Sequence, residues 1–499
     1  MHYMGLDVGQ TGCKAVIFDE NGNPIAHSYR EYRTIIPKEG WAELDSRAVI
    51  NSCFDVIKEV QDGAGKNKVK AISVSSQGEA FTPVGKGGEF LANATITFDT
   101  RAKEISERWS KDFGIKKLYQ ITGHTAHPMF TIFKLLWLKE NNPKIFEDAE
   151  KFLCFEDLVQ HSMGVEPHIG YSLAGRTMLF DIKNETWSEE ITDRAGIETS
   201  KLAIPVPSGK IVGEIPKKLA EKLGFETGAL IVSGGHDQPI GGLGAGAINE
   251  GMAMYAIGTS ICITPAFNEP VMNDTLMKNN LCTYHYSYPG MYTTVAFHLT
   301  GGNILRWFRD NFGQPELLEA NKTGRDVYDL IMDNMDDKPT SLMVLPYFTP
   351  TGTPYFDSEV SGIIHGLKLT TTRGQILRAL IEGVGYEMKL NLEILEKSGI
   401  SIKEIRAIGG GAKNDRMLQL MADILGVPVI RVKVTEAACM AAAMLACHAH
   451  SGEPLGELVA RWVKTERVIE PNPQNKEYYT ERFSIYKKMY PLLKKLEEK

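Results

Sequence analysis

The chain has 499 residues, more than the roughly 250 to 300 at which a single hydrophobic core stops growing, so two domains or more are expected. Its 43% hydrophobic and 23% charged residues are typical of a globular protein, and a net charge of -7 with a pI near 6.0 gives no electrostatic reason for a nucleic-acid or anionic-membrane partner. The seven cysteines have no metal-ligand spacing, and the N-terminus has no signal-peptide pattern. We therefore expect a cytoplasmic protein with reduced thiols and no membrane partner.

The first residues predict a β-hairpin. An apolar run over residues 3–8 and a second over 14–18 flank a polar glycine turn. This turn carries Asp7 and Thr11, with Lys14 close by, and its backbone N–H groups could hold a phosphate. A hairpin with merely polar tips is the alternative.

Polar side chains follow two predicted strands of the N-terminal half. Gln77 and Glu79 come after an apolar strand at residues 68–74, and Asp99 and Arg101 follow the next strand. Open α/β sheets place ligands at such strand ends. Turn formation and salt bridges are the alternative role for these residues.

The middle of the N-terminal half contains one dense apolar helix and one polar segment. Residues 128–141 predict a largely buried helix with Lys134 and Trp137 near a surface or cleft. Residues 166–193 are polar and predict a loop-rich excursion over a substrate pocket.

An acid at the end of a strand is the main candidate for catalysis. A short apolar run at residues 230–232 breaks at Gly234 and Gly235 and leads to Asp237. Such a carboxylate suits a general base that takes a proton from a hydroxyl. The alternative is a helix N-terminus with Asp237 near the cap.

The second half repeats the plan of the first. Residues 251–264 again show an apolar strand, a turn at Gly258 and Thr259, and an apolar strand. Such an echo predicts two like domains, residues 1–248 and residues 249–499, with a cleft between them.

Two glycine-rich turns in the second half suit nucleotide binding. The first includes Gly301 and opens a helix at residues 304–311. The second spans residues 409–414, between a strand at 405–408 and a helix at 415–425. The alanine-rich helix at 435–449 predicts close packing at a domain interface, and the charged residues 487–499 predict a solvated terminal helix.

Two long motifs resemble one protein family. Residues 129–141, including Thr131, Lys134 and Trp137, match the first signature of the FGGY carbohydrate kinases at every constrained position. Residues 362–367, followed by 375–382 with Glu382, match the second. Two such signatures in the right order make coincidence implausible.

This resemblance implies an α/β fold of two ribonuclease H-like domains of the actin and hexokinase ATPase type around a central cleft. It also implies ATP-dependent phosphorylation of a sugar or polyol hydroxyl, with Asp237 as catalytic base and Asp7 as the acid associated with Mg²⁺. The expected sugar-binding residues are Gln77, Gly78, Glu79, Asp99 and Asp237. The expected ATP-binding residues are Gln10, Thr11, Lys14, Gly258, Thr259, Gly301, Gly410, Gly411 and Asn414. The expected partner is a small-molecule sugar, and a homodimer is left open.

Departures from the family pattern restrict the substrate. Glycerol-specific members carry Arg-Glu where this chain has Gly78 and Glu79, and a tyrosine where it has Met129. Members acting on D-xylulose carry Met-His at that pair, although Gln77 and Asp99 agree with their pattern. His236 replaces the glycine common before the catalytic acid.

A pentulose such as xylulose, or a related ketose or deoxy-sugar, fits this pattern best. Kinases of ribulose, fuculose, erythritol or glycerol are the alternatives. A non-catalytic sensor on the same fold would be expected to lose the base or the phosphate loop, whereas Asp7, Thr11 and Asp237 are all present.

Overall fold

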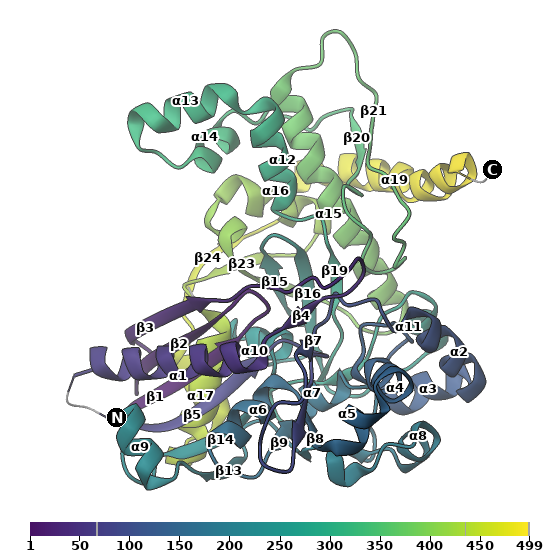
Figure 1. The fold of residues 1–499 in the computed structure, drawn as a ribbon. Helices are drawn as coiled ribbons and strands as arrows, with labels where there is room; N and C mark the ends of the chain where they lie inside the picture. The colour runs from purple at the N-terminus through teal and green to yellow at the C-terminus, as the bar shows by residue number, and fades with distance from the viewer. Residues whose placement is uncertain (66–67, 435, 498–499) are drawn as a thin grey trace.

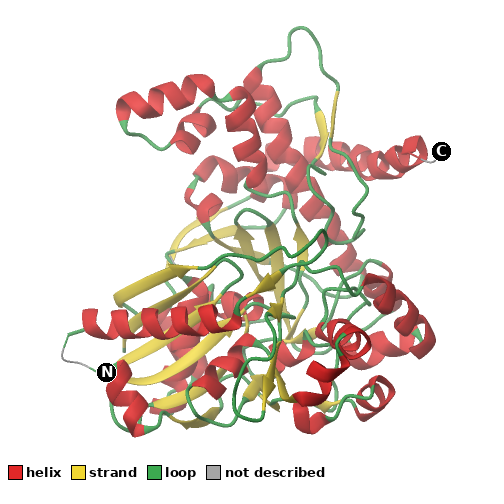
Figure 2. Cartoon of the chain, in the orientation of Figure 1, coloured by secondary structure: helices red, strands yellow, loops and turns green. Residues whose placement is uncertain are grey.

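The protein is built around two β-sheets, each flanked by helices (Figures 1 and 2). The computed structural model describes residues 1–65, 68–434 and 436–497. Thr435, which begins the expected alanine-rich helix, and the last two residues of the expected terminal helix lie outside these ranges.

The first sheet contains the predicted N-terminal hairpin. Its strand order is β13 (Ile211–Glu214), β14 (Leu230–His236), β5 (Val69–Ser76), β1 (His2–Val8), β2 (Gly12–Asp19) and β3 (Pro24–Glu31). Strands β1 to β3 pair antiparallel, whereas β5 and β14 continue the sheet in parallel. The carboxyl ends of β1, β5 and β14 therefore meet at one edge, where open α/β sheets bind ligands.

The second sheet repeats this plan, as the sequence predicted. Strands β15 and β16 form an antiparallel pair, and β22 and β23 continue in parallel from β15. The sheet consists of β17 (Tyr284–His285), β18 (Tyr292–Thr293), β16 (Ile261–Phe267), β15 (Met252–Ile257), β22 (Glu404–Ile408), β23 (Val429–Val432) and β24 (Thr465–Ile469), with β19 (Ala296–His298) also paired to β16.

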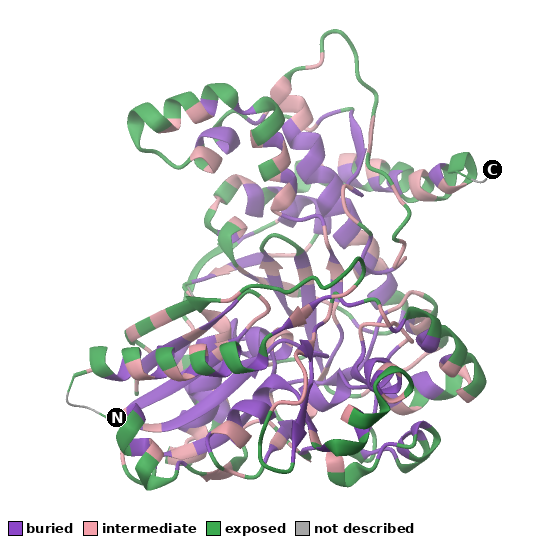
Figure 3. Ribbon diagram, in the orientation of Figure 1, coloured by how far each residue is buried: buried purple, intermediate pink, exposed green. Residues whose placement is uncertain are grey.

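Helices flank these sheets, among them those that the sequence predicted. In the N-terminal half they are α1 (Ser46–Gly63), α2 (Lys103–Phe113), α3 (Ile115–Thr122), α4 (Thr131–Asn141), α5 (Pro143–Asp148), α6 (Phe155–Ser162), α7 (Tyr171–Gly175), α8 (Glu189–Ala195), α9 (Lys217–Leu223) and α10 (Asp237–Gly244). In the C-terminal half they are α11 (Asp274–Lys278), α12 (Asn303–Phe312), α13 (Gln314–Thr323), α14 (Val327–Asp333), α15 (Arg373–Lys397), α16 (Asp415–Leu425), α17 (Ala437–Ser451), α18 (Leu455–Trp462) and α19 (Lys476–Glu497). Each large core lies between a sheet and its helices (Figure 3).

The alanine-rich helix α17, which follows the second sheet in sequence, packs closely against the first sheet, in keeping with its small side chains. It lies against β1, β5 and β14 of the first sheet, so its yellow-green ribbon appears among the N-terminal strands in Figure 1. Its backbone comes so close that a Cβ on Gly5 would lie 1.8 Å from the Cys439 carbonyl oxygen, and one on Gly244 would lie 2.0 Å from that of Ala437. The chain therefore crosses between the two sheets three times: after α10, before α17, and after α18, where it returns to the second sheet as β24.

Two expectations about ordered structure need correction. Residues 166–193 are not loop-rich, because they contain β9 (His168–Gly170), α7, the β10 (Phe180–Asp181) and β11 (Thr186–Trp187) hairpin and most of α8. The terminal helix α19 begins earlier than expected and buries Tyr479, Phe483 and Tyr486 in its added turns, whereas most of residues 487–497 are exposed as predicted. Across the described residues, no helix is long and apolar enough to span a bilayer.

Candidate active site

Asp237 occupies the junction of a sheet edge and a helix start. It is the first residue of α10, directly after β14, so it is both a strand-end acid and a helix-start residue. The expected break at the glycines is wrong, because β14 runs through Gly234 and Gly235 to His236. These glycines instead permit close packing, since a Cβ on Gly234 would lie 1.9 Å from the Val74 carbonyl oxygen and one on Gly235 would lie 2.2 Å from Ser172 Oγ.

The surroundings of Asp237 favour its protonated form. Burial, followed by the nearby carboxylates of Asp7 and Glu79, raises the pKa of Asp237 to about 7, against the lowering effects of Gln238 and Arg176. Its side chain is still 31% exposed and can reach a ligand. A carboxyl group with a pKa near neutrality is matched to general-base work.

Asp237 faces a cavity of about 190 Å³ between the halves. The predicted sugar-binding residues Gln77, Gly78 and Glu79 line this cavity, and so does Gln10, which was expected at the nucleotide. Other lining residues are Thr97, His124, Arg176, His236, Gln238, Ser260 and Cys262. Residues from both halves therefore line one chamber, whose wall also has an apolar part formed by Met129, Phe130, Val295, Phe297 and Phe356.

Two residues that line this chamber each carry a buried acceptor atom with no hydrogen-bond partner among the described residues. The Gln77 side-chain nitrogen donates to the Gly9 carbonyl at 2.9 Å, which leaves Gln77 Oε1 unpaired. His124 Nδ1 lies 2.8 Å from the Thr122 carbonyl and must donate to it, so His124 Nε2 is an unpaired acceptor. Burial lowers the pKa of His124 to about 3, which keeps this ring neutral. Unpaired buried acceptors are costly, and hydroxyl donors of a sugar would satisfy both.

The backbone at Glu79 is held by the first signature motif. Glu79 has a φ of 62°, which is unusual for a residue other than glycine. From α4, Thr131 Oγ1 donates to the Glu79 carbonyl at 3.0 Å, and Lys134 Nζ donates to the carbonyls of Ile96 at 2.7 Å and Glu79 at 3.4 Å. Helix α4 thus supports the turn that carries Glu79 into the cavity.

The Glu79 carboxylate is itself paired inside the cavity. It forms a salt bridge with Arg176 and accepts a hydrogen bond of 2.8 Å from Thr97 Oγ1. The Arg176 guanidinium also lies over the Phe130 ring, 4.9 Å from its centroid. Arg176 is the only lysine or arginine among the residues that line this chamber, and its charge is compensated by Glu79.

Asp99 does not line the cavity, contrary to its predicted sugar contact. Its carboxylate accepts hydrogen bonds from the Ala42 amide at 2.7 Å and from the backbone and guanidinium of Arg101. Arg101 lies between Trp41 and Trp137, 3.8 Å and 5.0 Å from their ring centroids. In this structure Asp99 therefore forms a structural salt bridge with Arg101, which was the alternative to a sugar contact.

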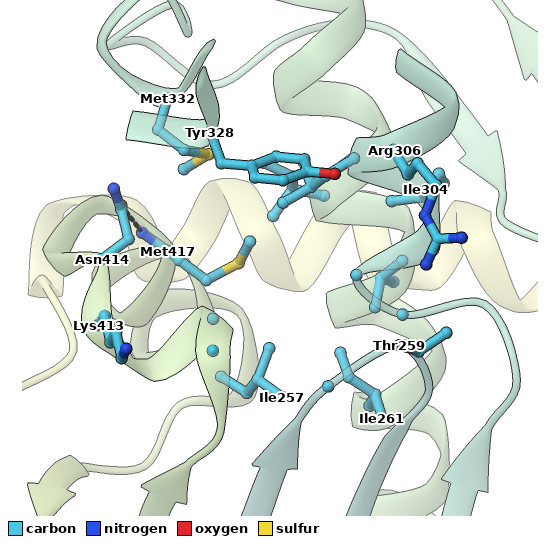
Figure 4. A pocket seen from close by; sticks show the side chains of 18 of the residues that line it. Ile257, Thr259, Ile261, Ile304, Arg306, Tyr328, Met332, Lys413, Asn414 and Met417 are labelled. Carbon is cyan, nitrogen blue, oxygen red and sulfur yellow. Dashed lines mark hydrogen bonds between the residues drawn. The ribbon is translucent and has the colours of Figure 1, made fainter. Parts of the chain in front are cut away.

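A second cavity, of about 660 Å³, lies in the C-terminal half (Figure 4). Six predicted nucleotide-binding residues line it, namely Gly258, Thr259, Gly301, Gly410, Gly411 and Asn414. It adjoins the first cavity at one turn, because Thr259 lines the larger cavity and the next residue, Ser260, lines the smaller. A nucleotide in the larger cavity could therefore extend its phosphates toward Asp237.

The glycines that line this second cavity differ in what a side chain at their positions would contact. A Cβ on Gly411 would lie 2.3 Å from Ile257 Cγ2, and one on Gly302 would lie 2.7 Å from the Gly258 carbonyl oxygen. Gly410 has open space around it, so its bare backbone is free for approach by a ligand. The Asn414 side chain accepts from the Met417 amide at 3.1 Å and caps α16, the hydrogen bond drawn in Figure 4.

The remaining predicted phosphate-loop residues lie outside both cavity linings. Asp7 accepts a hydrogen bond from Ser75 Oγ at 2.8 Å, and burial raises its pKa to about 6. Lys14 pairs with Glu436 at 2.7 Å, and Thr11 is exposed at the turn. Among the residues described, no group of three or more His, Cys, Asp or Glu side chains could hold a metal by itself.

Several residues of the sugar-side cavity were not predicted as ligands, among them Arg176, His124 and Gln238. Arg176 lies in a segment expected to cover the pocket, and His124 precedes the first signature by a few residues. Gln238 directly follows the predicted base. No local pattern distinguishes them, because they meet only through tertiary packing.

Comparison with known proteins agrees with this arrangement. The N-terminal domain model of the FGGY family of carbohydrate kinases matches residues 2–244, and the C-terminal domain model matches residues 253–450. The xylulose kinase of Bacillus subtilis (strain 168) is 28% identical over 498 residues, covering 99% of this chain and 98% of that protein.

Two solved structures extend the likeness to the whole fold. A ligand-bound xylulose kinase from Lactobacillus acidophilus has a TM-score of 0.89 at 25% identity and covers 99% of this chain and 98% of its own. A gluconate kinase from the same organism has a TM-score of 0.90 at 25% identity, with the same coverage. The fold is thus the two-domain α/β ATPase fold of the actin and hexokinase type. Because both family models match in order over most of its length, the chain belongs to the FGGY family of carbohydrate kinases and is an ATP-dependent sugar kinase.

Proposed function

We propose that this kinase phosphorylates a hydroxyl of a small ketose, a pentulose such as xylulose. The observation that carries this proposal is the chamber beside Asp237, which is lined by Gln77 and His124, two residues whose acceptor atoms Oε1 and Nε2 have no partner among the described residues. The likeness to xylulose kinases supports the same substrate class. A sugar acid fits less well, because the one cation of the chamber, Arg176, is already paired with Glu79.

In the proposed mechanism Asp237 accepts the proton of the attacking hydroxyl. Gln77, Gly78, Glu79 and His124 bind and orient the sugar so that this hydroxyl faces the adjoining nucleotide cavity. The turns at Gly258 to Thr259, Gly301 and Gly410 to Asn414 hold the nucleotide, and Gln10, Thr11 and Lys14 approach its phosphates from the hairpin. Positioning and exclusion of water supply most of the rate enhancement in such phosphoryl transfers.

Mg²⁺ is the proposed cofactor, with Asp7 as its protein ligand. The residues fit this ion, because Mg²⁺ at kinase sites is usually held by one or two carboxylates together with substrate phosphates. Asp7 supplies one such carboxylate at the end of β1, fixed by Ser75. When bound, the ion would neutralise phosphate charge.

We also propose that residues 1–248 and 249–499 act as two domains that close on the substrates. This proposal is supported by the separate sheets and by the position of Asp237 in one half and the nucleotide cavity in the other. A hinge near residues 247–252 follows from it.

A substrate panel tests the function. ADP release would be measured with saturating ATP and Mg²⁺ against D-xylulose, other ketoses, polyols, glycerol and gluconate. The highest kcat/KM is expected for a pentulose, with glycerol and gluconate weaker by at least about tenfold, the cost of roughly one unsatisfied hydrogen bond. Preference for gluconate or glycerol would contradict the proposed substrate, and no sugar-dependent ADP release would contradict the kinase function.

A further inference from the structure

A line of polar contacts reaches the Asp237 carboxylate from the other half of the molecule. His236 Nε2 lies 3.2 Å from Asp237 Oδ1, and His236 Nδ1 lies 3.0 Å from the hydroxyl of Tyr284. His236 ends β14 of the first sheet, whereas Tyr284 begins β17 of the second. This line of contacts therefore crosses the cleft beside the sugar chamber.

The chemistry of the partners fixes which atoms carry the protons in these contacts. Burial, with Arg176 and His124 nearby, lowers the pKa of His236 well below its usual value, so its ring is neutral and carries one N–H. Burial raises the pKa of the Tyr284 phenol, which keeps its hydroxyl protonated. An ionised Asp237 can only accept. Tyr284 therefore donates to Nδ1, and the ring proton is assigned to Nε2, which lies 3.2 Å from Asp237 Oδ1.

A second support of Asp237 also reaches across the cleft. The Gln238 side chain hydrogen-bonds Asp237, and Gln238 Oε1 accepts from Cys262 Sγ at 2.9 Å. Cys262 lies on β16 of the second sheet. Both neighbours of the base in sequence are thus anchored by side chains of the C-terminal half.

The position of His236 depends on the absence of a side chain at Gly78. A Cβ on Gly78 would lie 3.0 Å from both Cδ2 and Nε2 of the His236 ring. Contacts this short require the ring to move. The imidazole of His236 therefore occupies the space that a side chain at position 78 would need. The absence of that side chain lets the imidazole approach Asp237.

We propose that His236 and Tyr284 are positioning residues for Asp237, which hold Oδ1 so that the other carboxylate oxygen takes the proton of the sugar hydroxyl. Because Tyr284 belongs to the C-terminal half, the base is oriented only when the two halves are apposed at this contact. The inference rests on the proposed role of Asp237 as general base. It assigns a catalytic reason to two residues, His236 and Gly78, that depart from the family pattern.

Three variants test this line of contacts with the best sugar of the panel. Tyr284→Phe and His236→Leu should lower kcat by about 3- to 30-fold, the effect of one or two lost hydrogen bonds, while the KM for the sugar stays within about twofold. His236→Gln should recover most of the loss, because its amide can accept from Tyr284 and donate to Asp237. Tyr490→Phe is the matched control, since it deletes a tyrosine hydroxyl bond of 2.8 Å to Asp357, outside both cavities, and should leave kcat unchanged.

A spectroscopic readout separates this line of contacts from a general loss of structure. Nitrogen-15 NMR of labelled histidine should show His236 as the neutral Nε2–H tautomer in the wild type, and Tyr284→Phe should change its Nδ1 shift. Unchanged kcat in both variants, a loss confined to KM, or an Nδ1–H tautomer would overturn the proposal. Wild-type protein without sugar-dependent turnover would contradict the proposed function instead, and the tautomer would still decide whether the line of contacts exists.

Discussion

At the scale of single residues, Asp237 has the most specific expected phenotype. Asp237→Asn keeps the shape of the side chain but cannot accept a proton, so kcat should fall by about 10² to 10⁴-fold, the usual contribution of a general base. Circular dichroism should show an unchanged fold. Asp193→Asn, on the exposed surface of α8, is the matched control. Retention of more than about a tenth of wild-type turnover would exclude the proposed role.

The pH dependence of the reaction should report the same carboxylate. Burial and the charges of Asp7 and Glu79 raise the pKa of Asp237 to about 7, and only the deprotonated form is a base. The kcat/KM for the sugar should therefore rise with pH through about 7 and fall about tenfold per unit below it. The free energy of unfolding should depend on pH in the opposite direction. A carboxyl pKa that is raised in the folded protein stabilises the folded state at low pH, and this contribution is lost as the pH rises. A profile that is flat from pH 5 to 9 would be inconsistent with this environment.

At the scale of elements, α4 should control the affinity for sugar through the turn that carries Glu79. Lys134→Met removes the bonds from Nζ to the carbonyls of Glu79 and Ile96, each worth about 1.5 to 3 kcal/mol when the donor is charged. We expect the sugar KM to rise by at least about tenfold, with little change in the KM for ATP. Lys139→Met, on the same helix, loses comparable bonds to Ala195 and Gly196 away from the cavity and serves as the control. A change in the KM for ATP alone would contradict this prediction and would indicate that α4 supports nucleotide binding instead.

The same elements show what the sequence could reveal. Apolar runs around a glycine turn predicted β1 and β2, and the segment after the glycine-rich loop predicted α16 at its observed bounds. The sequence could not show that the Asp99 carboxylate pairs with Arg101, or that His124 and Arg176 line the chamber. These facts depend on contacts between distant segments, such as Arg176 with Glu79, for which no local spacing provides a signal.

At the scale of the whole molecule, the separation of Asp237 from the nucleotide cavity predicts closure of the two halves. Closure would bend the chain at residues 247–252 and also at the connections before α17 and after α18, since these two helices pack on the first sheet and β24 lies in the second. Small-angle scattering should show a smaller radius of gyration with sugar and a nonhydrolysable ATP analogue together than without ligands. ATP hydrolysis without sugar should be far slower than sugar phosphorylation, because the sugar contacts stabilise the closed state. An unchanged radius together with sugar-independent hydrolysis of similar rate would rule out this hinge.

The most direct test of the account is to identify the product formed from ATP and D-xylulose. Phosphorus-31 NMR of a reaction with Mg²⁺ should show a sugar phosphomonoester signal growing in step with ADP, absent without sugar and nearly absent with Asp237→Asn. Formation of inorganic phosphate alone, or of the same phosphomonoester at an equal rate by the Asp237→Asn protein, would contradict it.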